Sequence, residues 1–197
     1  PGARVFVIDP TPEDEALAGR LGAAVRAAIP GAEIGAHRDA VRVVGELDAL
    51  VRERESGPGG EPVILVLAGL HRLRDLRRSE DYSFSLDDDA GESADKRLAR
   101  VLREGPNAGV WTLAWCDTLT NLERTLERAT VREFGLRALL QMGASDSAAL
   151  IDSSAAANLG VNRAVLADDE TGTLVKFRPV DLPDPDAARR AAEILRA

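Results

Sequence analysis

Three polar residues follow apolar segments of this chain, where they are placed to do chemistry. Asp117 comes directly after the apolar stretch 110–115, and His71 and Asp75 follow the apolar stretch 63–68. A carboxylate or an imidazole at the end of a strand can orient a water molecule or contact a phosphate. Ordinary structural uses exist as well, because Asp117 can cap a following helix and the other two can be loop residues. Both interpretations stay open for each residue.

Arginines supply a second kind of candidate. Arg137 begins one apolar segment and Arg163 begins another. A guanidinium can pair bidentately with a phosphate, but it can equally form an ion pair at the surface. The Asp-Ser pairs at 146–147 and 152–153 favour helix capping.

Metal and thiol chemistry find little support in the spacing of the residues. His37, His71 and Cys116 are scattered and form no zinc-ligand pattern, so we expect no metal site. As the lone cysteine, Cys116 cannot form an internal disulfide, which indicates a reducing compartment, the cytoplasm. We expect it to be an inert buried thiol.

Trp111 and Trp115 lie at i, i+4 on a predicted strand and therefore share a face. This pattern favours core packing over stacking on an adenine.

Composition excludes several classes of protein. The 197 residues carry a formal net charge of −8 with 45% hydrophobic residues, which is typical of a soluble globular protein. No apolar run is long enough for a membrane-spanning helix. Lys96 and Lys176 are the only lysines, and neither lies in a GxxxxGK[ST] loop, so this sequence has no P-loop. The G-x-S-x-G motif is also absent.

Apolar strands alternate with amphipathic helices along the chain. Thr11, followed by Pro12, resembles the start of a helix that runs to about residue 28. The segment 79–93 is acidic and rich in turn residues, typical of an exposed loop. The remaining predicted elements are strands at 4–9, 32–35, 63–68, 110–115 and 136–142, helices at 38–54, 94–104, 118–128, 145–158 and 184–196, and a hairpin of 163–167 with 173–177.

This alternation predicts an α/β fold with a mostly parallel sheet covered by helices on both faces. The strands 63–68, 110–115 and 136–142 are the most apolar, and we expect them at its centre. Ligands bind such sheets at the carboxyl ends of the strands. The residues after Ala68, Trp115 and Met142 are therefore expected at the functional edge.

Five segments resemble, in order, parts of FtsK/SpoIIIE-type (FtsK–HerA) motor ATPases. The stretch PVILVLAGLHRLRDLR at 62–77 is similar to their Walker B region, and NAGVWTLAWCD at 107–117 to the next core strand. The further matches are 141–153, 158–166 and 172–179.

The resemblance covers essentially all of residues 1–185. It implies a three-layer, RecA-like (P-loop NTPase-type) fold with a C-terminal β-hairpin, formed by a partial ATPase domain over 1–183 and a C-terminal helix over 184–197. It also implies that the complete parent binds ATP and Mg²⁺, forms a homo-hexamer and moves double-stranded DNA. Under the resemblance Ala68 and Gly69 take the Walker B positions, His71 and Asp117 contact the nucleotide, and Arg137 or Arg163 acts on a neighbouring subunit.

Two departures from the family weaken catalysis by this chain alone. The family's P-loop lies upstream of the strand at 4–9, so we expect this chain to be the part that follows it. Ala68 stands where the family has the aspartate that holds magnesium, and alanine offers no oxygen ligand. We therefore expect the isolated chain to need no cofactor and not to hydrolyse ATP. The missing P-loop segment is its expected partner, and no membrane contact is expected.

Other functions remain as alternatives. Ala68 favours a non-catalytic scaffold or regulatory module, and the secretion branch of the family moves proteins instead of DNA. The net charge of −8 and the acidic segment 79–93 argue against a main DNA-binding surface here. An unrelated flavodoxin-like or receiver-type domain would require Asp9 as a working acidic residue, and Pro10 argues against it.

Overall fold

The computed structural model describes residues 2–54, 59–78 and 92–196. Most of the acidic segment predicted as a loop, at 79–91, lies outside the described residues. The chain forms two compact units, Pro1–Thr130 with Leu182–Ala197, and Val131–Asp181. None of the described helices is long and apolar enough to cross a membrane.

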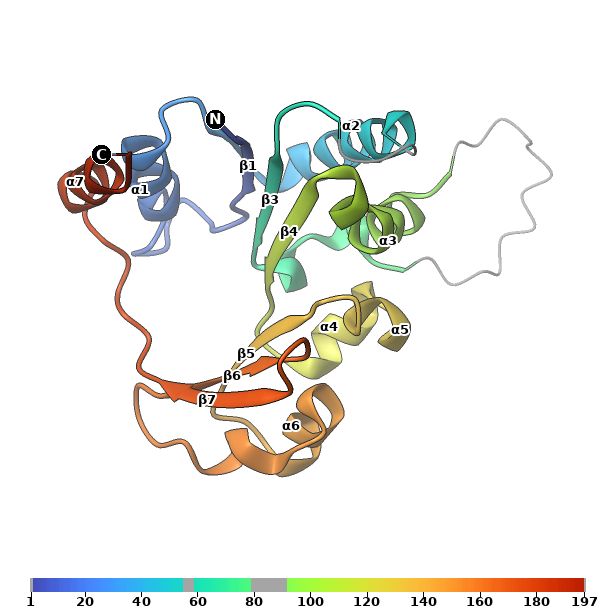
Figure 1. The fold of residues 1–197 in the computed structure, drawn as a ribbon, viewed down its shortest axis with the longest axis vertical. Coiled ribbons are helices and arrows are strands. Elements are labelled where there is room, and N and C mark those ends of the chain that lie inside the picture. Colours follow the sequence, from blue (N-terminus) through green and yellow to red (C-terminus); the bar gives the residue numbers. More distant parts are fainter. Residues whose placement is uncertain (1, 55–58, 79–91, 197) are drawn as a thin grey trace. The chain divides into compact units, whose positions relative to one another are not determined.

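The first unit is built around a four-stranded parallel sheet in the order β2-β1-β3-β4 (Figure 1). Its strands are β1 (Arg4–Ile8), β2 (Glu33–Gly35), β3 (Val63–Ala68) and β4 (Val110–Trp115). Its helices are α1 (Arg20–Ala28), α2 (Ala40–Glu53), α3 (Ala94–Glu104), α4 (Leu119–Thr125) and α7 (Pro185–Arg196), with α5 (Arg128–Val131) at the unit boundary. Short 3-10 turns are η1 (His37–Asp39), η2 (Leu70–Arg72), η3 (Arg74–Leu76) and η4 (Gly105–Ala108).

Helices cover both faces of this sheet, as the alternating pattern predicted (Figure 1). On one face, Val5 and Val7 of β1 pack with residues of α1, and α7 lies against α1. The helices α2 and α3 lie on the other face (Figure 1), and Val63, Leu65 and Leu67 of β3 are buried almost completely. A strand that is apolar on both sides suits this position between two helix layers.

The first predicted helix is shorter than expected. Thr11 does not cap a helix, because its amide and its hydroxyl both donate to Asp9 Oδ1, at 3.1 and 2.6 Å. The chain then makes turns, and α1 begins only after Gly19, whose φ of 71° lies in the left-handed region that favours glycine. Asp9 is thus occupied by a local turn, in line with the rejection of a receiver-type acidic site.

The second unit holds a separate antiparallel sheet in the order β5-β6-β7. Its elements are β5 (Leu136–Leu140), α6 (Ala144–Ile151), η5 (Ser154–Asn158), β6 (Ala164–Asp168) and β7 (Thr173–Phe177). The predicted hairpin is confirmed by the pairing of β6 with β7.

The prediction that 136–142 lies at the centre of the parallel sheet is wrong. β5 pairs antiparallel with β6, and Leu139 packs with Val165 and Ile151 in a small core of this unit. Only one face of β5 is covered, so Leu136 and Leu140 stay exposed. Because β5 belongs to a different sheet, the residues after Met142 do not lie at the edge formed by the ends of β3 and β4.

Serine residues organise the connection between β5 and β6. The buried hydroxyl of Ser147 accepts a hydrogen bond from the Ala156 amide at 3.1 Å and donates to the Ser153 carbonyl at 2.5 Å. Ser153 caps η5 through the Ala155 amide, as predicted, whereas Ser147 is a buried cross-link instead of a cap. Its hydroxyl fixes the turn after α6 to the following segment.

Candidate functional site at the ends of β3 and β4

β3 and β4 end at the same level. They pair in parallel with Val63 opposite Val110 and Ala68 opposite Trp115. The Gly69 amide donates to the Trp115 carbonyl at 3.2 Å, which holds the two strand ends together. The prediction that the residues after Ala68 and Trp115 share one edge is therefore confirmed.

Gly69 makes the sharp turn that follows β3. Its φ of 106° lies in the region that favours glycine, and a Cβ at this position would lie 3.3 Å from Cγ of Pro10 and 3.6 Å from the ring of His71. The chain then enters η2, which brings His71 back over the strand ends. The imidazole packs edge-on against Trp115, with the ring centroids 5.1 Å apart and an interplanar angle of 78°.

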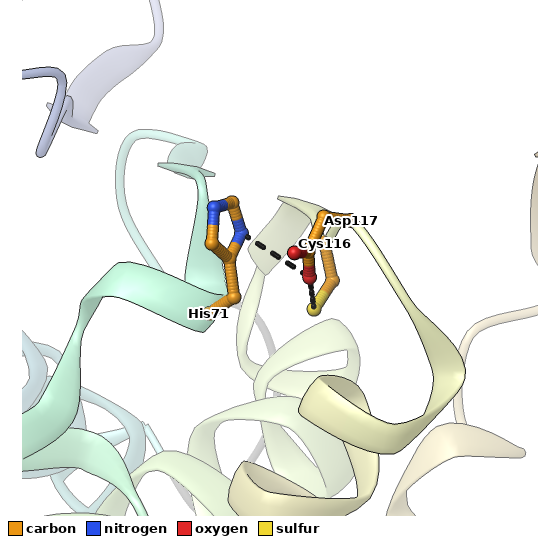
Figure 2. A group of neighbouring side chains, drawn as sticks. All are labelled: His71, Cys116 and Asp117. Atoms are coloured by element: carbon orange, nitrogen blue, oxygen red, sulfur yellow. Dashed lines mark hydrogen bonds and ion pairs between the residues drawn. The ribbon is translucent and has the colours of Figure 1, made fainter.

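His71, Cys116 and Asp117 form one cluster at this edge (Figure 2). His71 Nδ1 lies 3.7 Å from Asp117 Oδ1, and Cys116 Sγ lies 3.8 Å from the same oxygen. Nδ1 is buried without a hydrogen-bond partner among the described residues. At the other side of the ring, Arg72 Nε donates to His71 Nε2 at 3.2 Å, and the Arg72 guanidinium also pairs with Glu15.

Asp117 is held as an ionised carboxylate. Asn121 Nδ2 donates to its two oxygens at 2.9 and 3.1 Å. This hydrogen bond lowers the pKa of Asp117, and the nearby His71 acts in the same direction. The N-cap of α4 is Thr118, whose hydroxyl accepts from the Asn121 amide at 3.2 Å. Asp117 braces the first turn of α4 through a side-chain contact and is not the cap itself.

Cys116 is half-buried and lies beside a carboxylate. Burial is the main cause that raises the pKa of its thiol, and the Asp117 charge adds to this. The free thiol is therefore a poor nucleophile near neutral pH, as the sequence predicted. A cation that replaced the thiol proton would remove the unfavourable interaction with Asp117.

The other candidates lie apart from this cluster or have partners elsewhere. Asp75 is exposed in η3. Arg137, in the second unit, donates to both oxygens of Asp169 at 2.5 and 2.7 Å, whereas Arg163 is exposed just before β6. The cluster is built from the first unit alone.

The tryptophans of β4 are not core residues. The exposed fractions are 47% for Trp111, 64% for Leu113 and 53% for Trp115. We call these three residues the β4 stripe. β4 is the last strand of the described parallel sheet, and α1 packs near β1 instead, which leaves the stripe uncovered. The prediction of core packing is wrong because burial depends on a neighbour that these residues lack here.

The closeness of His71 and Cys116 was not predicted from the sequence, because known zinc-ligand patterns, such as those of zinc fingers, place ligands close together along the chain. Both residues follow parallel strands, Val63–Ala68 and Val110–Trp115, and that signal could have placed them at one edge.

Comparisons with known proteins give matches in structure only. No family model matches the sequence, and no curated protein matches it either. EccC of Thermomonospora curvata (ATPases 2 and 3, in complex with a signal sequence peptide) matches over 98% of this chain and 36% of its own, with a TM-score of 0.63 and 15% identity. EssC of Geobacillus thermodenitrificans (ATPases 2 and 3) matches over 98% and 37%, with a TM-score of 0.60 and 12% identity.

A viral protein gives a match over most of both chains. B204, the DNA-packaging ATPase of Sulfolobus turreted icosahedral virus, matches over 91% of this chain and 84% of its own, with a TM-score of 0.58 and 7% identity. This chain spans little more than a third of the EssC and EccC chains. The resemblance to FtsK/SpoIIIE-type motors is thus confirmed at the level of the fold, and the chain has the fold of P-loop ATPase domains of this kind.

Proposed function

We propose that this chain is part of an FtsK/SpoIIIE-like, ATP-driven motor and contributes the ends of β3 and β4 to its nucleotide site. The observation that carries the proposal is the cluster at that edge, where His71 and Asp117 lie 3.7 Å apart beside Ala68. Parallel α/β sheets bind ligands there, and a carboxylate near an imidazole can orient the attacking water. The parent would bind ATP with Mg²⁺.

The proposal assigns the phosphate-binding loop to another segment. Ala68 has no oxygen ligand for Mg²⁺, and neither lysine of the chain lies in a P-loop sequence. The β4 stripe supports a partner that covers it, because a contiguous patch of exposed large apolar side chains usually marks an interaction surface. A strand that pairs with β4, followed by a helix over the stripe, would supply both the cover and the P-loop. Alone, the chain should not hydrolyse ATP.

Two cargoes are compatible with this motor. Double-stranded DNA follows from the sequence resemblance, and the matched B204 is a DNA-packaging ATPase. The net charge of −8 favours a protein cargo for this part of the motor, as does the match to EccC, whose structure holds a signal sequence peptide. We propose a cytoplasmic homo-hexamer. Arg163 suits the contact with a neighbouring subunit better than Arg137, which is already paired with Asp169.

Measurement of ATP hydrolysis tests this function. We expect no Mg²⁺-dependent hydrolysis by residues 1–197, and hydrolysis by the complete protein that its gene encodes. In that protein, Asp117→Asn should lower kcat on the order of 10²-fold, the usual range for a lost acid–base group. Asp75→Asn is the matched control, since Asp75 is exposed outside the cluster.

The outcomes separate the alternatives. Turnover by residues 1–197 would contradict the assignment of the P-loop to another segment. A complete protein without ATP hydrolysis would favour the scaffold or regulatory module that Ala68 suggests. Equal loss of kcat in Asp75→Asn and Asp117→Asn would remove the special role of Asp117.

A further inference from the structure

The cluster of His71, Cys116 and Asp117 combines three donor types. It offers an imidazole nitrogen, a thiol sulfur and a carboxylate oxygen, and these atoms all lie within 4.8 Å of one another (Figure 2). Mixed nitrogen, sulfur and oxygen donors suit borderline-soft divalent cations, whereas Mg²⁺ prefers oxygen alone.

We propose that His71, Cys116 and Asp117 form a three-ligand site for Zn²⁺, with a water molecule as the fourth ligand. This inference does not depend on the proposed ATP chemistry, because the three donors all belong to the described first unit and need no nucleotide. It reverses the expectation, drawn from sequence spacing, that the chain has no metal site.

The distances are close to those of a tetrahedral site. Zinc–ligand bonds of about 2.0–2.3 Å place neighbouring ligand atoms about 3.3–3.6 Å apart in a tetrahedron. Two of the three separations already measure 3.7 and 3.8 Å, from Asp117 Oδ1 to His71 Nδ1 and to Cys116 Sγ. The third, between the sulfur and the imidazole, is within 4.8 Å and so must shorten by at most about 1.2–1.5 Å.

The surroundings hold the ligands in place and leave a path for the ion. Asn121 fixes the Asp117 carboxylate, and Trp115 packs against the edge of the His71 ring. Such contacts orient ligands in metal sites. The His71 side chain is only 14% exposed, but that of Asp117 is 37% exposed, so a hydrated ion can reach the site from solvent.

Binding requires one proton to leave and one to move. The Cys116 thiol gives up its proton to water and binds as thiolate, while Asp117 is already ionised. Because His71 Nε2 accepts from Arg72, the proton of the neutral ring is on Nδ1. Zn²⁺ takes the Nδ1 lone pair, the ring proton moves to Nε2, and the Arg72 N–H must turn away. Two anionic ligands and one neutral ligand then balance the charge of the cation.

Titration of the metal-stripped chain with Zn²⁺ and with Co²⁺ tests the site without ATP. We expect one ion per chain and, with Co²⁺, the thiolate-to-metal charge-transfer band together with the visible bands of tetrahedral coordination. Each of Cys116→Ser, His71→Gln and Asp117→Asn should weaken Zn²⁺ binding by at least about tenfold. His37→Gln is the matched control, and it should bind as tightly as the unchanged chain.

Arg72→Ala adds a test that separates a metal site from a cluster with only a structural role. Loss of the competing hydrogen bond, worth about 1 kcal/mol, should tighten Zn²⁺ binding roughly fivefold. Circular dichroism of the metal-free variants must show that each is folded. Absence of the charge-transfer band, or Zn²⁺ binding that Cys116→Ser leaves unchanged, would overturn the proposal. The ATPase outcome affects neither result.

Discussion

Replacement of Asp48 by alanine tests how α2 is fixed to α3. Asp48 lies on α2 and is 5% exposed. Its Oδ1 accepts from Arg100 Nη1 at 2.5 Å, and its Oδ2 accepts from Arg52 Nε at 3.1 Å. Both arginines also contact Glu92, which precedes α3. The four side chains form a charged network of which Asp48 is the most buried member.

The cost of the change follows from this burial. Removal of one partner from a buried ion pair destabilises a protein by about 3–5 kcal/mol, because the other charge is left uncompensated. Here Glu92 still contacts both Arg52 and Arg100, so we expect the lower end, about 3 kcal/mol. Asp48→Asn keeps an acceptor for Arg100 and loses only the charge, so it should cost about half as much, roughly 1.5 kcal/mol.

Urea denaturation followed by tryptophan fluorescence measures the change. Trp111 and Trp115 both lie on β4 and report on the first unit alone. A loss of 3 kcal/mol corresponds to a fall in Tm of roughly 6–12 °C for a domain of this size. Glu46→Ala is the matched control on the same helix, since its pair with Arg42 is exposed and should contribute nothing measurable.

A small loss of stability would contradict this role of Asp48. If Asp48→Ala lowered the free energy of unfolding by less than about 1 kcal/mol, the network would stabilise the fold no more than an exposed ion pair does. The same outcome would mean that apolar contacts alone hold α2 on α3.

Three further changes test other parts of the structure. Ser147→Ala should destabilise the second unit by about 2 kcal/mol, measured by circular dichroism in urea, because the Ala156 amide loses its buried acceptor. Gly69→Ala should cost about 1–3 kcal/mol in the fluorescence assay, since its φ of 106° strains any other residue. The hydrogen bond from Arg100 lowers the pKa of Glu92, so the ionised carboxylate stabilises the folded state. The unchanged chain should therefore be more stable than Glu92→Gln, and this difference should be largest above about pH 5. It should disappear as the pH falls through the lowered pKa. Melting temperatures measured between about pH 3 and 7 check this, and a difference that stays constant over this range would contradict the pair.

Local sequence signals predicted an element well where its own residues determine its structure. β3 carries apolar residues on both faces, and this pattern alone indicates a strand between helix layers. The hairpin of β6 and β7 could also be predicted from the sequence, because its two strands lie close together along the chain with turn residues between them.

The pairing of segments that are distant in the sequence could not be predicted from the same local signals. The sequence of β5 indicates a strand, but its partner is chosen by packing of Leu139 against Val165 and Ile151, which come later in the chain. The tryptophans of β4 show the same limit. Apolar type predicts a preference for burial, and only the arrangement of neighbouring elements decides whether Trp111 is covered.

Only part of the candidate site could be predicted from the sequence, for the same reason. The strand ends after Ala68 and Trp115 were placed correctly, because parallel strands of similar length end together. The turn at Gly69 was not foreseen, and it is this turn that carries His71 back toward Cys116. Two residues so far apart in the sequence leave no local signal that they will be neighbours in the fold.

The chemistry at this edge argues for two separable roles. At the end of β3, Ala68 offers no oxygen ligand for Mg²⁺, whereas the end of β4 presents Asp117 and Cys116 beside His71. Sulfur and imidazole nitrogen favour Zn²⁺ over Mg²⁺, so excess Mg²⁺ should not displace bound Zn²⁺. Mg²⁺ in a complete motor would instead depend on phosphate oxygens and on the segment that supplies the P-loop. Displacement of Zn²⁺ by Mg²⁺ alone would mean that Asp117 is the only effective ligand, and would return this edge to ordinary phosphate chemistry.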